Sequence, residues 1–359
     1  MAELTELDLT AEIVDLTAAV VDVPSESHDE ALLADLVERA LRAYPHLSVD
    51  RDGNTVVART NMGHSERVLI GGHLDTVPAA ENLPSHLDGD RLYGLGACDM
   101  KGGVAVALQC AALVTHPVRD VTYVFYECEE IESEFNGLKR LAETKPEWLA
   151  ADLALLMEPS NADVEAGCQG TMRAEIRTSG RRAHSARWWL GQNAIHDAVE
   201  MLNRLQSYQP KEVTIDGLVY REGLSAVKIA GGVAGNVIPD ECVLTVNYRF
   251  APNVDEAQAE AHVREVFDGF DVTIVDAVAG AMPGLDRPAA KEFLAAVGAT
   301  PKPKFGWTDV ARFSVLGIPA MNFGPGNAEL AHTREEYVEV GQLRESVAKL
   351  RAWLSAAGD

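Results

Sequence analysis

Short apolar runs that alternate with helical patterns fill the first 160 residues, and they restrict the fold more than any other feature. Apolar residues recur at helical spacing, which predicts helices at 9–21, 29–44, 102–114 and 136–144. The runs between them are rich in β-branched and aromatic residues, which predicts strands at 55–59, 67–72, 121–127 and 152–157. Because strands that alternate with helices pair in parallel, we expect an α/β layered domain with a mostly parallel central sheet.

From residue 171 the order changes to strand, helix, strand, strand, helix, strand. These elements are predicted at 171–180, 193–208, 224–232, 241–250, 255–270 and 271–280. The order is that of a ferredoxin-like α+β unit. A helix, a strand and a helix then resume at 289–298, 319–323 and 340–356. We therefore predict a discontinuous domain formed by residues 1–170 and 285–359, interrupted by a small inserted domain at 171–284.

The charge balance argues against polyanionic partners. The chain has 31 Lys and Arg against 55 Asp and Glu, a formal net charge of −24, which repels nucleic acids and anionic membranes. The first residues carry acids where a signal peptide has bases, and the apolar run 102–114 is too short to cross a bilayer. Five cysteines without a CxxC pair are typical of a reduced compartment, so we expect a cytoplasmic protein.

Acidic residues crowd the end of one predicted strand. The stretch "VTYVFYECEEIESE" at 121–134 ends in five glutamates within eight residues, among them Glu129 and Glu130. Like charges at such a spacing repel one another, so either the turn is solvated or its carboxylates hold a cation. Two more strand ends are polar: "VLIGGHLDTVP" presents His73 and Asp75, and "LALLMEPS" presents Glu158.

Two further candidates lie in loops. Asp99 stands in the glycine-rich turn "LYGLGACDMKGG" ahead of an apolar helix, where capping that helix is the alternative role. The adjacent Cys98 is expected to be a small buried thiol rather than a ligand. His332 follows the Gly/Pro-rich loop "NFGPGNAELAH", and a single loop histidine usually has no special role.

Taken together, these residues predict a metal site. The carboxyl ends of parallel strands lie along one edge of a sheet, so several of the candidates should converge there. They are His73, Asp99, Glu129, Glu130, Glu158 and His332. Two imidazoles and several carboxylates without thiolates suit Zn²⁺, with Co²⁺ or Mn²⁺ as substitutes. This convergence favours the cation over the solvated turn.

Seven motifs, in order along most of the chain, resemble the M20 family of zinc-dependent amidohydrolases and exopeptidases. They are "HLDTVP", "GACDMKGG", "CEE", "MEPS", "GRRAHSA", "GNVIPDE" and the late "AH". The resemblance implies a zinc-exopeptidase-like catalytic domain and an inserted lid and dimerisation domain. It also implies two Zn²⁺ per subunit, bridged by Asp99. His73 and Glu158 would complete one site, and Glu130 and His332 the other.

The same resemblance implies roles beside the metals. Asp75 would orient the His73 ring, and Glu129 would be the general base. His184 in "GRRAHSA" would help to bind the oxyanion across a homodimer interface; a structural histidine at a strand-to-helix turn is the alternative. The family's Asp-Glu-Glu is here Cys128-Glu129-Glu130.

Other polar residues are candidates for substrate binding or for solvent exposure. Asn236 and Arg249 could grip a substrate carboxylate, which the planar guanidinium binds in two places, although an arginine on an exposed strand is usually solvated. "GWTDVARF" resembles a family substrate loop and adds Thr308 and Arg312. The remaining acids near the "CEE" motif are expected to be solvated, with replacement of a named ligand by one of them as the alternative: Glu127, Glu132 and Glu134.

The implied activity is hydrolysis of an N-acyl amino acid. The "DMKGG" form and the chain length are most similar to actinobacterial family members that cleave N-succinyl-LL-2,6-diaminopimelate to succinate and LL-2,6-diaminopimelate in lysine biosynthesis. N-acetylornithine deacetylation, cleavage of another N-acyl amino acid and metallo-exopeptidase activity would use the same metal core. A non-catalytic metal-binding regulatory protein, or a fold whose acids only decorate loops, are the alternatives from other classes.

Overall fold

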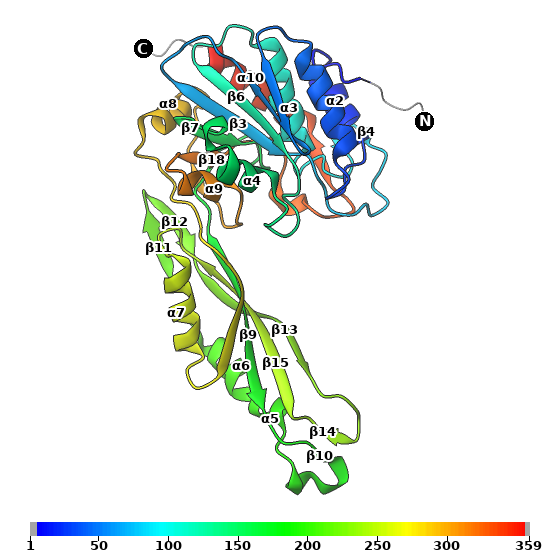
Figure 1. Cartoon of the computed structure of the whole chain (residues 1–359), viewed down its shortest axis with the longest axis vertical. Helices are drawn as coiled ribbons and strands as arrows, with labels where there is room; N and C mark the ends of the chain where they lie inside the picture. The colour runs from blue at the N-terminus through cyan, green and yellow to red at the C-terminus, as the bar shows by residue number, and fades with distance from the viewer. Residues whose placement is uncertain (1–5, 356–359) are drawn as a thin grey trace. The chain divides into compact units, whose positions relative to one another are not determined.

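The computed structural model describes residues 6–355, which form two compact units (Figure 1). The first contains the described residues up to Ala166, Pro283–Lys302 and the residues from Asp309 on; the second contains Gly167–Met282 and Pro303–Thr308. The sequence assigns Pro303–Thr308 to the catalytic domain, but hydrogen bonds tie this segment to the second unit. The Gln169 amide donates to the Lys304 carbonyl at 3.3 Å, and the Trp307 indole to the Ala279 carbonyl at 3.0 Å.

A mixed sheet organises the first unit. Its strands, in spatial order, are β1 (Ser48–Asp52), β2 (Thr55–Arg59), β6 (Asp120–Tyr126), β3 (Arg67–His73), β7 (Leu153–Leu156), β18 (Ala320–Asn322), β8 (Glu165–Ala166) and β17 (Lys302–Pro303). The central strands β6, β3, β7 and β18 are parallel, as predicted. β1, β2 and β8 pair antiparallel at the two sides. The carboxyl ends of the central strands therefore share one edge.

Helices surround this sheet. They are α1 (Ile13–Val21), α2 (Ala31–Arg42), α3 (Lys101–Leu113), α4 (Gly137–Thr144), α8 (Pro288–Val297), α9 (Val310–Val315) and α10 (Val340–Ser355). α3 is buried from Lys101 to Ala112 and packs on α1, α10 and β3, which explains its apolar sequence on all sides. A Cβ at Gly103 would lie 2.1 Å from the Met157 carbonyl oxygen, so only glycine lets α3 approach the end of β7 this closely.

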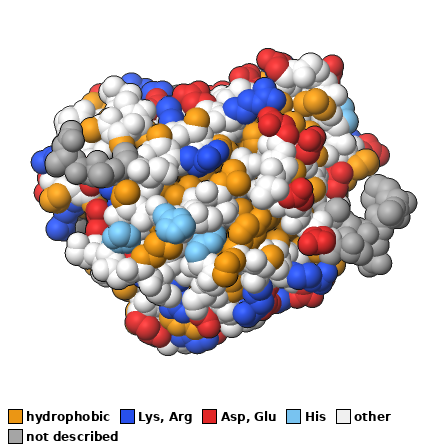
Figure 2. Space-filling model, turned by 90° about the horizontal axis from the view of Figure 1, so that it is seen from above, with side chains coloured by type: hydrophobic (Ala, Val, Ile, Leu, Met, Phe, Trp, Pro, Cys, Tyr) orange, Lys and Arg blue, Asp and Glu red, His pale blue; other side chains and the backbone are white. Residues whose placement is uncertain are grey.

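Shorter elements complete the first unit. A small sheet consists of β19 (Tyr337–Glu339), β5 (Arg91–Tyr93) and β4 (His86–Asp88), and the 3₁₀ turns are η1 (Pro146–Trp148) and η3 (Ala328–Leu330). Among residues 6–355, none of the helices has the length and apolarity needed to cross a bilayer. The face in Figure 2 carries acidic and basic side chains interspersed, so the negative net charge does not form one continuous patch there.

The second unit has the predicted ferredoxin-like order. Its antiparallel sheet contains β13 (Gly223–Gly231), β15 (Glu241–Phe250), β9 (Gly170–Ser179) and β16 (Asp271–Val278), in that spatial order. Its helices are α5 (Ala194–Asp197), α6 (Val199–Ser207), α7 (Glu256–Val266) and the 3₁₀ segment η2 (Ser185–Leu190). Alternate side chains of β9, including Met172 and Ile176, pack into a core with helix residues such as Met201 and Val263.

Several local features differ from the sequence prediction, among them the following. The helix predicted over 193–208 is two helices, α5 and α6, which meet at Ala198. Two ribbons were not predicted: β11 (Glu212–Ile215) with β12 (Leu218–Arg221), and β10 (Ala183–His184) with β14 (Val237–Ile238). α1 begins at Ile13, after an extended Glu12, rather than at residue 9.

Candidate metal centre and active site

The predicted strand-end residues lie at one edge of the sheet. His73 is the last residue of β3, and Asp75 lies two residues beyond it. Glu129 and Glu130 follow β6, Glu158 follows β7, Asp99 lies just before α3, and His332 lies between η3 and β19. Because β6, β3 and β7 are parallel neighbours, their carboxyl ends bring these side chains together.

Three overlapping groups of side chains could each hold a metal ion. In each group the ligand atoms lie within 4.8 Å of one another. The groups are His73–Asp99–Glu158, Asp99–Glu130–His332 and His73–Glu129–Glu130. Asp99 belongs to two of them, which is the arrangement a bridging carboxylate requires. The six residues expected to converge do so, and each group combines imidazole with carboxylate oxygens, a donor set that suits Zn²⁺.

Both histidine rings face Asp99. The His73 Nε2 atom is 3.2 Å from Asp99 Oδ1, and His332 Nε2 is 3.6 Å from Asp99 Oδ2 and 2.9 Å from Glu130 Oε1. Burial would raise the pKa of Asp99, but the two imidazoles hold it below its ordinary value. The carboxylates of Asp99 and Glu130 in turn raise the pKa of His332 to about 10. These shifts favour an ionised Asp99 next to a positively charged His332 when no metal is bound.

Asp75 joins the His73 ring to the turn that carries the two glutamates. Its buried carboxylate accepts hydrogen bonds from the backbone N–H groups of Glu129 and Glu130, both at 3.0 Å, and from Ser27 Oγ at 2.8 Å. Asp75 Oδ1 also lies 3.5 Å from His73 Nδ1. Burial would raise the pKa of Asp75, but His73 and the two N–H donors lower it below its ordinary value. Asp75 is thus placed to fix both the ring and the turn.

Glu129 lies in an environment that disfavours its ionised form. Burial raises its pKa well above the ordinary value, and the carboxylates of Asp309, Glu158 and Glu130 add to this effect, while His73 opposes it. A carboxylate with a raised pKa is a stronger base, as proton transfer near neutral pH requires. Glu129 therefore has the electrostatic setting of a general acid–base group.

The acidic residues around the "CEE" motif differ in their exposure to solvent. The prediction that Glu127 is solvated is wrong: it is buried, pairs with Arg140 at 2.6 Å and accepts a bond from the Asn54 amide at 3.1 Å. Glu132 and Glu134 are exposed, as predicted. Cys98 is a buried thiol, also as predicted, and donates to the Asn327 carbonyl at 3.0 Å.

The loop around Arg312 is held by the chain itself. The Arg312 guanidinium pairs with Asp309 and donates to Ser133 Oγ at 3.3 Å. Asp309 is fully buried and also accepts a bond from the Asn136 amide at 2.8 Å. Thr308, the other candidate in this motif, is buried in the second unit, where its carbonyl accepts a bond from the Cys168 thiol at 3.7 Å. Arg312 is therefore already paired before any ligand is considered.

In the second unit, a short ribbon presents two of the candidates together. His184 of β10 pairs with Val237 of β14, and the Ser185 amide donates to the Asn236 carbonyl at 2.9 Å. His184 and Asn236 are both exposed. His184 Nδ1 accepts a bond from the Ala186 amide at 3.0 Å, so the neutral ring carries its proton on Nε2, where it can donate to an oxyanion. Arg249, on β15, is partly buried, and burial lowers its pKa.

Sequence reasoning missed three polar residues of the first unit: Ser27, which is half-buried, and Asp309 and Glu336, which are buried. Ser27 and Glu336 bond to residues 48 and up to 240 positions away in the chain. Ser27 and Glu336 stand in polar stretches typical of surface loops, so no local pattern indicates their roles, whereas Asp309 lies inside the motif "GWTDVARF" that was chosen only for Thr308 and Arg312.

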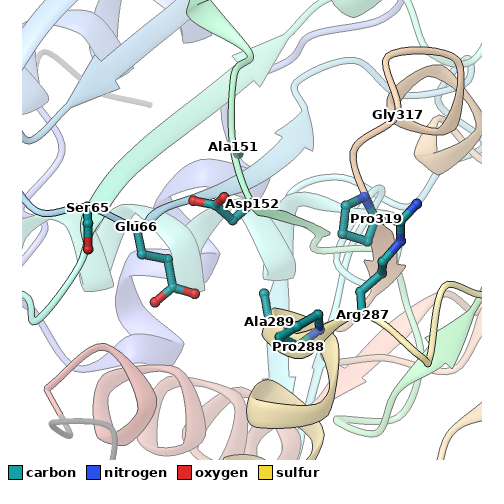
Figure 3. A pocket seen from close by; sticks show the side chains of 9 residues that line it. All are labelled: Ser65, Glu66, Ala151, Asp152, Arg287, Pro288, Ala289, Gly317 and Pro319. Atoms are coloured by element: carbon teal, nitrogen blue, oxygen red, sulfur yellow. The ribbon is translucent and has the colours of Figure 1, made fainter.

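A cleft of about 370 Å³ lies at the opposite edge of the sheet (Figure 3). Its residues Glu66, Asp152 and Pro319 directly precede β3, β7 and β18, so it faces the amino ends of these strands. Figure 3 shows Glu66 and Arg287 on opposite sides of the cleft. The acids here have partners: Glu66 lies 3.3 Å from Arg119 Nε, and Asp152 accepts a bond from the Arg67 amide at 2.9 Å.

The fold and the site together define a class. The chain belongs to the M20 family: the model described as peptidase family M20/M25/M40 matches residues 69–356. Members of this family are metal-dependent hydrolases, and this chain is accordingly a hydrolytic enzyme.

Particular relatives narrow the class. The chain is 55% identical over 351 residues to DapE of Mycobacterium tuberculosis, covering 97% of this chain and 99% of the relative. It is 46% identical over 360 residues to the succinyl-diaminopimelate desuccinylase of Corynebacterium glutamicum, covering 97% and 98%. Among solved structures, a Staphylococcus aureus tripeptidase has the same fold, with a TM-score of 0.79 at 20% identity over 97% of this chain and 98% of that one.

Proposed function

We propose that this protein hydrolyses N-succinyl-LL-2,6-diaminopimelate to succinate and LL-2,6-diaminopimelate. The observation that carries the proposal is the convergence of two imidazoles and four carboxylates at the carboxyl edge of the sheet. The similarity over nearly the whole chain to a Corynebacterium glutamicum protein with this named activity supports the choice of substrate.

Two Zn²⁺ ions are the proposed cofactor. His73, Asp99 and Glu158 would hold one ion, and Asp99, Glu130 and His332 the other. Each set supplies three protein ligands with an imidazole among them, which is how catalytic zinc sites keep a position open. When bound, such ions lower the pKa of a water molecule and polarise the amide carbonyl.

Glu129 would move the proton. Its carboxylate takes a proton from the attacking water as the new C–O bond forms. It then delivers that proton to the amide nitrogen as the C–N bond breaks, so that the amine leaves in neutral form. Asp75 would hold His73 and the Glu129–Glu130 turn in place throughout, through the bonds described above.

The second unit would form a homodimer. Its edge strand β13 has β15 as its only neighbour among the described residues, and it exposes large apolar side chains, as do η2 and the helices α5 and α6. These side chains are Trp188, Trp189, Leu190, Ile195, Val199, Leu202, Val227 and Ile229. Burying them against a second copy would be favourable. In such a dimer His184, on its exposed ribbon with Asn236, would bind the oxyanion of the partner's site.

A subunit-mixing experiment tests this last role. Inactive His184→Ala and Glu129→Ala proteins are mixed under conditions where subunit exchange is verified by mass. Recovery of activity up to about a quarter of wild type would support sites shared between subunits, because about half of the dimers are mixed at equal amounts and one of the two sites in each mixed dimer is intact. No recovery after verified exchange would contradict it.

The substrate is tested by direct comparison. The zinc-loaded protein is assayed with N-succinyl-LL-2,6-diaminopimelate and with N-acetylornithine, with and without a chelator, and kcat/KM is compared. We expect a chelator-sensitive preference for the succinyl substrate. A preference for N-acetylornithine would keep the metal core and reject the substrate, and activity on neither with metal bound would reject both assignments of substrate.

A further inference from the structure

The carboxylate of Glu336 holds the loop that ends in Asp99. Its side chain is buried, with 2% of the residue exposed. Oε1 accepts hydrogen bonds from the backbone N–H groups of Cys98 at 2.9 Å and Asp99 at 3.0 Å, and Oε2 accepts one from Gly96 at 3.0 Å. One side chain thus binds three backbone donors within four consecutive residues, including the N–H of Asp99 itself.

Glu336 also belongs to the segment that carries His332. It lies four residues after His332 and directly before β19, whose Tyr337 pairs with Tyr93 of β5. The Glu336 carbonyl extends this pairing, since it accepts a bond from the Gly94 amide at 3.1 Å. The main-chain pairing of β19 with β5 therefore brings the two segments together. The Glu336 side chain fixes the last part of the Asp99 loop, which lies beyond this pairing.

Two segments far apart in the sequence meet at this point. Asp99 and His332 face each other, with Asp99 Oδ2 3.6 Å from His332 Nε2. Hydrogen bonds from N–H groups to a carboxylate are stronger than bonds to a neutral acceptor, and a carboxylate offers only acceptors. A side-chain amide in the same place would have to turn its NH₂ group toward at least one of the three N–H donors.

We propose that Glu336 is a positioning residue that sets Asp99 relative to His332 and so tunes metal affinity. This inference rests on the proposed function, in which Asp99 and His332 are metal ligands. Partners that hold ligand-bearing groups without touching the ion typically contribute about 10–100-fold to metal affinity or activity. Glu336 acts through the backbone of the ligand loop rather than through a ligand side chain.

Asp120 offers a matched control. It is also a buried carboxylate, 3% exposed, and it accepts bonds from the consecutive backbone N–H groups of Met62, Gly63 and His64 at 2.7, 3.1 and 3.1 Å. It is the first residue of β6, at the amino edge of the sheet, whereas the ligands follow the carboxyl ends. Asp120→Asn therefore removes an equivalent loop anchor far from the proposed metal centre.

The test is a calorimetric titration of metal-free wild type, Glu336→Gln and Asp120→Asn with Zn²⁺, with thermal melting of each protein. We expect both variants to melt at a lower temperature than wild type. Only Glu336→Gln should bind Zn²⁺ more weakly, by about 10–100-fold. Its activity should recover as the Zn²⁺ concentration is raised, which a general loss of folded protein would not allow.

Each other outcome overturns a different statement. If Glu336→Gln binds Zn²⁺ as tightly as wild type, or if Asp120→Asn weakens binding equally, Glu336 is only a structural anchor. If the wild type itself binds no stoichiometric metal, the proposed function fails first. Should Glu336→Gln not fold, the test uses Glu336→Asp, which keeps the charge with a shorter reach. This variant must bind Zn²⁺ more weakly than wild type, and wild-type affinity in it overturns the proposal.

Discussion

Acidic side chains at the two edges of the central sheet have different kinds of partner. At the amino edge, Glu66 lies beside Arg119, and Asp120 accepts three backbone N–H bonds. At the carboxyl edge, Asp99 and Glu130 face each other and two imidazoles, with ligand atoms within 4.8 Å. The chain neutralises the first group with its own donors and gathers the second around a space that suits cations. Carboxylates that several donors of the chain already bind contribute to stability, whereas a cluster of carboxylates and imidazoles with perturbed pKa values is a candidate site for chemistry.

The largest expected effect tests the catalytic side of this comparison. Glu129→Gln removes the carboxylate that would move the proton but keeps its size. We expect kcat to fall by about 10²–10⁴-fold, the usual contribution of a general acid–base group, while Zn²⁺ still binds. Steady-state kinetics on the zinc-loaded variant measure this. A kcat within a few fold of wild type would assign proton transfer to another group.

A smaller effect is expected at Asp75, which contacts the proposed ligand His73 but is not itself a proposed ligand. Asp75→Asn keeps an acceptor near His73 but cannot accept from Ser27, Glu129 and Glu130 with the same charge. Zn²⁺ affinity or activity should fall by about 10–100-fold. Asp152→Asn, at the amino edge, is the control and should leave both unchanged. Equal losses in the two variants would remove the functional distinction between the edges.

Arg119 tests the stabilising role of the amino edge. Its buried guanidinium lies between Glu66 and Glu292 and over the Trp353 ring, 4.6 Å from the ring centroid. Arg119→Leu should lower the free energy of unfolding by about 1–3 kcal/mol, because hydrogen bonds to a charged group are lost. Chemical denaturation measures this, and kcat/KM of the folded variant should equal that of wild type. A change in kcat/KM would mean that the two edges are coupled.

The smallest effect concerns pH. Burial would raise the pKa of Asp120, but the bonds from Met62, Thr60 and His64 and the charge of Arg67 hold it below its ordinary value of 3.8. A lowered pKa in the folded state stabilises the fold above the ordinary pKa and loses this contribution as pH falls through the folded value. The stability advantage of wild type over Asp120→Asn should therefore shrink below about pH 4. Denaturation curves from pH 7 to pH 3 would show it, and an advantage that grows on acidification would refute it.

Local patterns were enough to predict much of this protein. Parallel strands end at one edge of a sheet, so the polar residues after 67–72, 121–127 and 152–157 had to meet, and the structure brings His73, Glu130 and Glu158 to that edge. The β-α-β-β-α-β order likewise predicted the sheet of the second unit. These predictions succeed because periodicity and strand direction are properties of short segments.

Other features were decided only by contacts between distant segments. Glu127 was predicted to be solvated, but it is buried and bound by Arg140 and the Asn54 amide. Pro303–Thr308 belongs to the second unit because its hydrogen-bond partners lie there. Glu336 reads as a surface residue in "TREEY", and its role depends on donors about 240 positions earlier. The sequence by itself determined which residues could carry the chemistry, because the end of a strand can be recognised from a short segment. Only the tertiary structure decided which buried groups hold those residues in place. Each of these hydrogen bonds joins two segments whose proximity no local pattern encodes.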